Sequence, residues 1–237
     1  MDSTAGISQA ERDGAKVYSP RMLAVYDVRV LWFNCGLIWR CSPRRTLDLY
    51  NRNMSADHLD IGTGSGWHLC HARYPATSPA VTLVDLNRPS LEVTSRRLRR
   101  RGIDPVTAVG SVLQPLPVDR RRFGSVSATW LMHCVPGGWD TKGAAFRHIA
   151  DVMADDGVHF GATVLNTGVS HTPFSRAEMK RLRAHGIYHN DADDLDGLVA
   201  ALEQAFESVQ VHTRGSAALW TVRGPRRAPG PDAAERR

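Results

Sequence analysis

The sequence has little of what marks a membrane-spanning, secreted or disulfide-bonded protein. Its 237 residues contain no uninterrupted apolar run of about 18 residues, the length that a spanning helix needs. The N-terminus reads MDSTAGISQAERDGAK, which is polar and lacks the apolar segment of a signal peptide. The four cysteines form no CxxC pair, so we expect reduced, mostly buried thiols. These absences predict a cytoplasmic protein without a membrane partner.

Lysine is also scarce, because only three of the 30 Lys and Arg residues are lysines. The formal net charge of +6 therefore rests on arginine. A basic surplus can serve nucleic acid or an acidic substrate. Much of it, however, lies in SRRLRRR (95–101) and in the tail RGPRRAPGPDAAERR (223–237), where we expect solvated side chains. The charge alone therefore does not predict a nucleic-acid partner.

The composition predicts one domain between two disordered ends. A hydrophobic share of 42% with 23% charged residues is typical of a globular protein, and the length suits one sizeable core. Residues 1–16 and 223–237 are polar or rich in Pro, Gly, Ala and Arg, which predicts disorder there. Residues 17–222 contain no linker and no repeat, so we expect a single domain with an N-terminal helical cap.

Strands and helices alternate along most of this domain. An apolar segment at about 20–39 is predicted to be helical, with Pro43 closing it. Short apolar or β-branched runs predict strands at HLDIG, AVTLVD, DPVTAVG, FGSVSATWLM and VHFGATVL. Helical patterns lie at 67–74, 88–101 and 141–157. This alternation predicts βαβ units and a parallel sheet with right-handed crossovers.

The end of the domain has a different pattern. Helices are predicted at about 175–184 and 195–205, followed by the strands SVQVHTR (208–214) and AALWTV (217–222). Only Gly215 and Ser216 separate these strands, which predicts a two-residue hairpin turn. We therefore expect an α/β fold whose mostly parallel sheet ends in an antiparallel β-hairpin.

The stretch LDIGTGSGWHL (59–69) places three glycines within five residues after the first predicted strand. Glycine is favoured where the backbone takes a positive φ or approaches another group closely. The spacing is GxGxG and not the GxGxxG of dinucleotide-binding proteins, so alone it fits a cofactor loop or a tight turn. Asp85 ends the second predicted strand, 19 residues after Gly66, where a carboxylate can bind ribose hydroxyls or cap the next helix. Together the two features predict a nucleoside site at the carboxyl edge of the sheet.

Five segments resemble the class I S-adenosylmethionine-dependent methyltransferases in order and spacing: LDIGTGSGWHL, VTLVDLN, GSVLQPLP, FGSVSATWLMHCVPGG and DDGVHFGATVL. The resemblance covers roughly residues 20–222. YDVRVLWFNCGLIWRCSP also resembles a small stand-alone bacterial subgroup that is associated with secondary metabolism. The resemblance implies a three-layer Rossmann-like sandwich with a seven-stranded sheet, and S-adenosyl-L-methionine as the cofactor.

The resemblance also implies which residues bind this cofactor. Asp60 would sit near the methionine amino group through the loop, Asp85 would hold the ribose, and Leu86 would pack on the adenine. Ser111 stands where such enzymes usually have an aspartate, so either its hydroxyl or the backbone of Val112 would read the adenine edge. The other implied residues are Gly62, Thr63, Gly64 and Gly66 in the loop, Trp130 and Leu131 at the seam between cofactor and acceptor, and Tyr26 and Arg40 over the methionine carboxylate.

His133, after the fourth predicted strand, is the best candidate for a general base or an orienting residue. His171 and His189, on a predicted lid at about 166–193, are further candidates. No metal site is expected, because the His and Cys side chains of HLCH (68–71) point in different directions on a helix and no second cluster completes four ligands.

We therefore expect methyl transfer to O, N, S or C of a small-molecule acceptor in natural-product metabolism. Three alternatives stay open. Ser111 leaves room for a protein of this fold that keeps the cofactor but catalyses another reaction, such as cyclisation. The arginines leave room for an RNA methyltransferase, although no (D/N)PPY-type motif is present. A non-enzymatic binding protein is the third, and the intact glycine loop with Asp85 argues against it.

Overall fold

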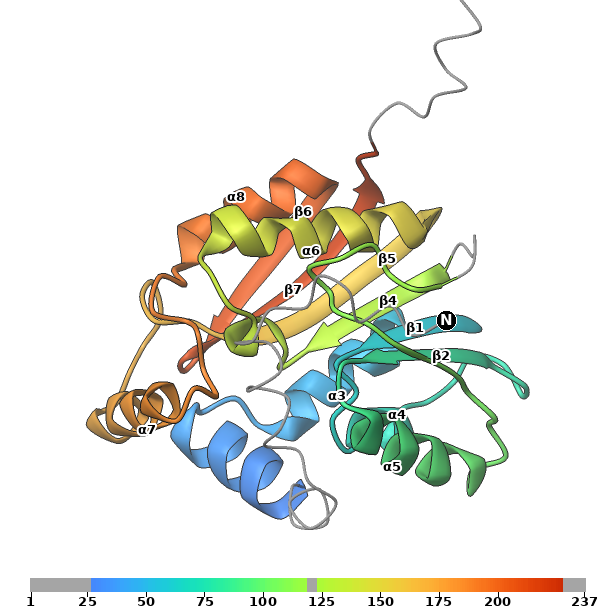
Figure 1. Cartoon of the computed structure of the whole chain (residues 1–237), viewed down its shortest axis with the longest axis horizontal. Coiled ribbons are helices and arrows are strands. Elements are labelled where there is room, and N and C mark those ends of the chain that lie inside the picture. Colours follow the sequence, from blue (N-terminus) through green and yellow to red (C-terminus); the bar gives the residue numbers. More distant parts are fainter. Residues whose placement is uncertain (1–26, 119–122, 228–237) are drawn as a thin grey trace, which may run out of the picture.

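A computed structural model describes residues 27–118 and 123–227, with side chains from Phe33 onward. Its centre is a seven-stranded sheet with helices on both faces (Figure 1). All seven predicted strands are present, as β1 (Asp57–Ile61), β2 (Ala80–Asp85), β3 (Val106–Val109), β4 (Phe123–Thr129), β5 (Met153–Val164), β6 (Phe206–Arg214) and β7 (Ala217–Pro225).

The strand order across the sheet is β3-β2-β1-β4-β5-β7-β6. Strands β1 to β5 pair in parallel, and β7 pairs antiparallel with both β5 and β6. The chain reverses between β6 and β7 through Gly215, whose φ is 57°, and Ser216. The predicted α/β sheet with a final antiparallel hairpin is therefore confirmed.

The helices form one layer on each face of the sheet (Figure 1). One layer consists of α3 (Pro43–Asn53), α4 (Trp67–His71) and α5 (Arg88–Arg99), and the other of α6 (Trp139–Val152) and α8 (Leu195–Ala205). Each layer has its own hydrophobic core against the strands, with Tyr50 and Leu98 in the first and Phe146 in the second. Within the described residues, no helix combines the length and the apolar character needed to cross a bilayer.

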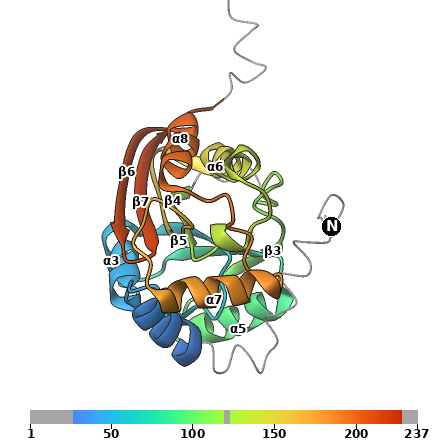
Figure 2. The same cartoon turned by 90° about the vertical axis from the view of Figure 1, so that its left-hand side faces the viewer.

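A third apolar cluster closes the carboxyl end of the sheet. The π-helix η1 (Asp27–Ile38) and helix α7 (Pro173–Ala184) lie side by side there (Figure 2). Cys35 and Trp39 pack in this cluster with Met179, Leu182 and Tyr188. The N-terminal cap and the segment after β5 therefore cover the same edge of the sheet.

A buried ion pair fixes the segment before α8 to α6. Lys142 Nζ donates to both carboxylate oxygens of Asp193, at 2.7 and 2.6 Å, and to the carbonyl oxygen of His189 at 3.1 Å. Both charged side chains are fully buried, so the cost of desolvating them opposes their attraction. The three hydrogen bonds match the three donors of the ammonium group, which leaves this buried charge fully satisfied.

The helix predicted over 141–157 is wrong at its end, because α6 stops at Val152. Met153 is already extended, with φ −72° and ψ 152°, and pairs with Phe123. The register then shifts before Val158 pairs with Ser125. An irregular strand start of this kind has no period of two, so the sequence pattern alone extended the helix too far.

The N-terminal cap contains the predicted helix and, after it, a helix that was not predicted. Its helix is described from Asp27 to Ile38, and Pro43 opens the unpredicted helix α3. Proline suits the first turn of a helix because the N–H that it lacks has no partner there anyway. Residues 1–16 and Tyr26 lie outside the described residues, so the predicted disorder of 1–16 stays a prediction.

The domain extends beyond its predicted C-terminal limit at residue 222. β7 continues to Pro225, and Arg223 and Pro225 pair with Ser208 and Phe206 of β6. Backbone pairing to the neighbouring strand thus extends regular structure into a segment whose composition favours disorder. Residues 228–237 lie outside the described residues.

Replacing Lys142 by methionine would leave the Asp193 carboxylate buried without its charged partner. We expect Lys142→Met to lower the free energy of unfolding by about 3–5 kcal/mol, measured by urea denaturation. The double variant with Asp193→Leu removes both charges and should recover most of the loss. Unchanged stability of the single variant would contradict the role assigned to the pair.

Candidate active site

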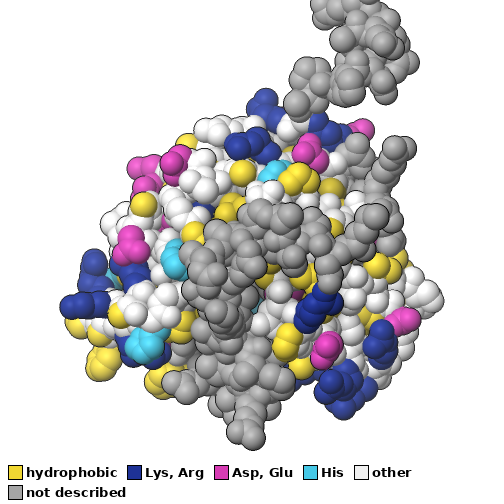
Figure 3. Space-filling model, viewed as in Figure 1, with side chains coloured by type: hydrophobic (Ala, Val, Ile, Leu, Met, Phe, Trp, Pro, Cys, Tyr) yellow, Lys and Arg dark blue, Asp and Glu magenta, His cyan; other side chains and the backbone are white. Residues whose placement is uncertain are grey.

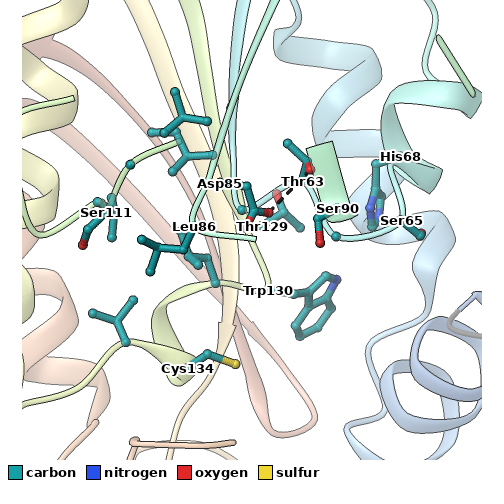
Figure 4. Close-up of a pocket in the computed structure, with 18 of the residues that line it drawn as sticks. Thr63, Ser65, His68, Asp85, Leu86, Ser90, Ser111, Thr129, Trp130 and Cys134 are labelled. Atoms are coloured by element: carbon teal, nitrogen blue, oxygen red, sulfur yellow. Dashed lines mark hydrogen bonds between the residues drawn. The ribbon is translucent and has the colours of Figure 1, made fainter. Parts of the chain in front are cut away.

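A pocket opens at the carboxyl ends of β1, β2 and β4 (Figure 4). Its empty space, with the open mouth included, is about 960 Å³. Nine of the residues predicted to bind the cofactor line it: Gly62, Thr63, Gly64, Asp85, Leu86, Ser111, Val112, Trp130 and Leu131. Sequence reasoning missed the lining residues Ile61, Ser65, Trp67, His68, Val84, Ser90, Gly110, Thr129, Cys134, Val135 and Pro136. Most of these are chain neighbours of predicted residues, so extending each motif by a few positions would have found them.

The loop between β1 and α4 depends on glycine. Gly62, Gly64 and Gly66 have φ values of 74°, 53° and 71°, in the left-handed region that residues with a Cβ avoid. The Gly62 N–H donates to the Val84 carbonyl oxygen at 2.9 Å and thereby ties the loop to β2. A Cβ on Gly66 would lie 2.6 Å from Thr94 Cγ2. Gly66 therefore makes room for α5, and it lies outside the pocket lining.

Helix α5 and the turn after it hold this loop and α4 from outside. Arg97 Nη1 donates to the Ser65 carbonyl oxygen at 3.0 Å, and Arg101 Nη1 donates to the Leu69 carbonyl oxygen at 2.9 Å. A charged donor makes a stronger hydrogen bond than a neutral one. Two arginines that we predicted to be solvated thus stabilise the backbone of the loop and of α4. Sequence reasoning missed them because the contacts connect residues 32 positions apart.

Asp85 faces the pocket from the end of β2 (Figure 4). Its Oδ1 accepts the Asn87 N–H at 2.8 Å, and its Oδ2 lies 3.5 Å from the Thr63 hydroxyl. Burial raises the pKa of Asp85 to about 6, against the backbone N–H groups of Asn87, Gly64 and Thr63, which lower it. Asp85 therefore presents to the pocket a carboxylate that is mostly ionised at neutral pH.

Asp60 lies beneath the loop, outside the pocket lining. Its Oδ2 accepts the Tyr50 hydroxyl at 2.8 Å and the Ser127 hydroxyl at 2.5 Å. Burial raises the pKa of Asp60 to about 6, against these two hydrogen bonds. The carboxylate links β1 to α3 and β4, which gives Asp60 a supporting place beneath the loop, and its predicted position near the methionine amino group stays a prediction.

Ser111 lines the pocket on the side where Leu86 also lies (Figure 4), and Val112 follows it in the lining. The Ser111 hydroxyl oxygen accepts the Leu113 N–H at 3.0 Å. The Val112 carbonyl oxygen accepts a hydrogen bond from His148 Nδ1 at 3.1 Å. This end of the pocket thus offers a hydroxyl and backbone groups where the resemblance implies an aspartate.

Trp130 follows β4 in a backbone conformation that is rare for a residue with a side chain. Its φ is 63°, and its backbone N–H donates to the Ala162 carbonyl oxygen at 2.7 Å. A strained residue of this kind costs about 1–3 kcal/mol. The side chain is 9% exposed, and its indole Nε1 is buried without a hydrogen-bond partner among the described residues. An unsatisfied buried donor costs about a further 1–3 kcal/mol. The fold therefore holds Trp130 in the pocket lining at a cost in stability.

His133 does not reach the pocket lining. It is 4% exposed, and its Nδ1 accepts the Val164 N–H at 3.2 Å. Burial, with a smaller contribution from Lys142, lowers the pKa of His133 to about 3. The ring is therefore neutral at physiological pH and is used inside the fold, which gives no support to its predicted role as a general base.

Three other predicted residues are also away from the pocket lining. Arg40 is exposed, and its Nη2 donates to the Ser170 carbonyl oxygen at 3.2 Å, where it connects the cap to the segment after β5. His171 and His189 each have a buried Nε2 without a partner among the described residues, but neither lines the pocket. Tyr26 lies outside the described part of the chain.

Comparison with known proteins identifies relatives along nearly the whole chain. A family model described as a methyltransferase domain matches residues 59–157. Demethylluteothin O-methyltransferase of Streptomyces thioluteus is 40% identical over 90% of this chain and 92% of its own length. The physcion biosynthesis cluster O-methyltransferase of Aspergillus chevalieri is 36% identical over 90% of this chain and 96% of its own.

Solved structures share the fold at low sequence identity. An O-methyltransferase from neocarzinostatin biosynthesis, in complex with S-adenosyl-L-homocysteine and 1,4-dihydroxy-2-naphthoic acid, is 19% identical with a TM-score of 0.58. Phosphoethanolamine N-methyltransferase 2 of Haemonchus contortus, in complex with S-adenosyl-L-methionine, is 11% identical with a TM-score of 0.67. The matches cover 92% and 93% of this chain but only 62% and 61% of those chains.

Fold and pocket together define an α/β protein that binds a nucleoside cofactor at the carboxyl edge of its sheet. The chain belongs to the methyltransferase family, and the solved structures that share its fold include a complex with S-adenosyl-L-methionine. The pocket fits this group, because Asp85 suits a ribose and the described lining contains no Lys or Arg that a phosphate would call for.

Arg97 should matter for cofactor binding although it is not in the pocket lining. We expect Arg97→Ala to weaken S-adenosylhomocysteine binding about tenfold, because the Ser65 carbonyl loses a charged donor. Isothermal titration calorimetry measures the change. The matched control is Arg96→Ala, at an exposed position on the same helix. Equal effects of the two variants would mean that net charge, and not the contact with the loop, matters.

Asp85 should make cofactor binding depend on pH. Ribose hydroxyls favour its ionised form, so we expect the affinity for S-adenosylhomocysteine to be constant above about pH 7 and to fall below about pH 6. Asp85→Asn should bind at least tenfold more weakly at neutral pH, with no such slope, since one charge-assisted hydrogen bond is lost. Calorimetry between pH 5 and pH 8 tests both statements. If the affinity of Asp85→Asn fell with pH in the same way as that of the wild type, another group, such as Asp60, would cause the pH dependence.

Proposed function

We propose that this methyltransferase transfers the methyl group of S-adenosylmethionine to a hydroxyl oxygen of a small, largely apolar acceptor in natural-product metabolism. The observation that carries the proposal is the uneven polarity of the pocket. Asp85 is the one carboxylate of its described lining, whereas the part that follows Trp130 consists of Leu131, Cys134, Val135 and Pro136 and carries no charged side chain. The names of the two relatives as O-methyltransferases support oxygen as the atom that is methylated.

When bound, the cofactor supplies a methyl group that is activated by a positively charged sulfur. The residues of this chain hold and orient it. We assign the ribose to Asp85, the adenine to Leu86 with Ser111 and Val112, and the methionine part to Thr63 and Gly64 of the loop.

The fold then contributes mainly positioning and exclusion of water. Holding two reactants in the right geometry supplies much of the rate of a bimolecular reaction. Helices η1 and α7 cover the carboxyl edge of the sheet with an apolar cluster that includes Trp39 and Tyr188. Trp130 belongs both to this cluster and to the pocket lining, so the cover is continuous with the site.

The described histidines favour an acceptor with an acidic hydroxyl. His68 lines the pocket, but its Nε2 lies 2.7 Å from the Thr46 hydroxyl, and burial lowers its pKa to about 3. His133 is in the same state. Neither ring is poised to take a proton at neutral pH, so a phenol or an enol that ionises by itself suits this pocket best.

The two alternative enzymes have less support. Arg97 and Arg101, which motivated an RNA substrate, contact backbone carbonyls of this chain. On the face shown in Figure 3, basic and acidic side chains are interspersed outside the grey atoms and form no continuous basic patch. A cyclase of the same fold would be recognised by turnover without consumption of the cofactor.

The test is turnover with 1,4-dihydroxy-2-naphthoic acid and with a panel of simple phenols and enols. S-adenosylhomocysteine is quantified, and the product is identified by mass spectrometry. Equal amounts of S-adenosylhomocysteine and an O-methylated product support the proposal. Formation of product without S-adenosylhomocysteine would contradict the proposal and indicate a non-methylating reaction. Methylation of RNA but of no small acceptor would contradict the proposed class of acceptor. Asp85→Ala serves as the binding-deficient control.

His133→Asn tests the histidine separately. The asparagine amide can accept the Val164 N–H in place of Nδ1, so we expect kcat to change by less than about tenfold. Loss of a true general base costs about 10²–10⁴-fold. A loss of that size, with unchanged affinity for S-adenosylhomocysteine, would restore His133 as the base.

A further inference from the structure

One residue of the pocket lining carries a buried hydrogen-bond donor that the cofactor assignment does not use. The indole Nε1 of Trp130 has no partner among the described residues, although the ring lines the pocket. In the close-up, Trp130 lies on the side of Ser65 and His68, while Ser111 lies at the other end (Figure 4). The donor is therefore placed away from the adenine end.

The ring is held in place by the fold. The Trp130 backbone N–H is bonded to Ala162 of β5, and its φ of 63° directs the side chain out of the strand pattern. The ring packs in the cluster that contains Trp39 and Tyr188, and its centroid lies 6.3 Å from that of His133. With these contacts the indole has little freedom to turn toward another partner, so its N–H is preorganised for something that enters the pocket.

We infer that the Trp130 indole N–H donates a hydrogen bond to the oxygen of the acceptor that is methylated. The inference rests on the proposed function and names the residue that recognises the acceptor oxygen. An N–H group suits an oxygen lone pair and is repelled by a sulfonium. The bond becomes charge-assisted and stronger when the acceptor oxygen is ionised. Trp130 therefore favours an anionic acceptor. Such an acceptor suits this pocket because neither His68 nor His133 is poised to take its proton.

The first experiment compares two ligands that differ by one oxygen. Binding of 2-naphthol and of naphthalene to the complex with S-adenosylhomocysteine is measured by calorimetry for wild type and for Trp130→Phe. We expect the variant to bind 2-naphthol about five- to tenfold more weakly, the equivalent of one buried neutral hydrogen bond, and naphthalene with less than a twofold change. Trp67→Phe is the matched control, because it shortens another indole of the same pocket. It should affect both ligands equally.

The second experiment observes the N–H itself. The chain has six tryptophans, and the Trp130→Phe spectrum identifies the Trp130 signal in a ¹H–¹⁵N correlation spectrum. We expect 2-naphthol to shift this indole proton downfield, and naphthalene and S-adenosylhomocysteine alone to leave it without such a shift. A benzothienyl isostere at position 130 keeps the ring size without the N–H, and it should reproduce the selective loss of 2-naphthol affinity.

Several outcomes would overturn the inference. Equal losses for both ligands would show that the ring serves packing alone. A loss of S-adenosylhomocysteine affinity in Trp130→Phe would assign the N–H to the carboxylate of the cofactor instead. Absence of 2-naphthol binding to wild type would refute it directly. Oxygen-selective binding through Trp130 without any methyl transfer would refute the proposed function and leave Trp130 as an oxygen-binding residue.

Discussion

The site depends on a backbone constraint in the loop after β1, where three left-handed glycines stand within five residues. Gly62 is tied to Val84 of β2, and the Ser65 carbonyl is held by Arg97 of α5. Because glycines provide no side-chain groups, specificity must come from residues that other strands bring to the loop. Asp85 arrives from β2 and Trp130 from β4, and the strand order β2-β1-β4 places both beside it. The site therefore needs both the left-handed loop and the strand order that places Asp85 and Trp130 beside it.

Two buried carboxylates near this loop show how environment divides their roles. Burial raises the pKa of both Asp60 and Asp85 to about 6. Asp60 accepts hydrogen bonds from the hydroxyls of Tyr50 and Ser127, so that carboxylate connects β1 to α3 and β4 inside the framework. Asp85 is held by backbone N–H groups and faces the pocket. The raised pKa of Asp85 in the folded state favours folding below the pKa that Asp85 has in the unfolded chain. This contribution is lost as the pH rises through about 6. At neutral pH the buried carboxylate therefore lowers the stability of the ligand-free protein, which is the cost of keeping a binding group there.

The strands, the hairpin and the glycine loop with Asp85 were predictable because they follow from local patterns: period, turn residues and the end of a strand. What was missed depends on contacts distant in sequence. Pro43 fits the end of one helix and the start of another, and only packing against the sheet distinguishes the two. The role of Arg97 requires the loop and α5 to be adjacent, and Met153 leaves α6 because Phe123 offers a strand partner. None of these pairings has a signature in either segment alone.

The segment WLMH after β4 shows why its titratable residue, His133, does not reach the pocket lining. β4 stops pairing with β5 at Thr129, opposite Ala162, so the Val164 N–H lies beyond the paired region. His133 Nδ1 accepts that N–H from the short 3₁₀ turn Met132–Cys134. A buried N–H needs such a partner, so the histidine is committed to completing the sheet edge. Trp130 precedes this turn in the left-handed conformation, and its indole N–H, a donor that does not titrate, has no hydrogen-bond partner among the described residues.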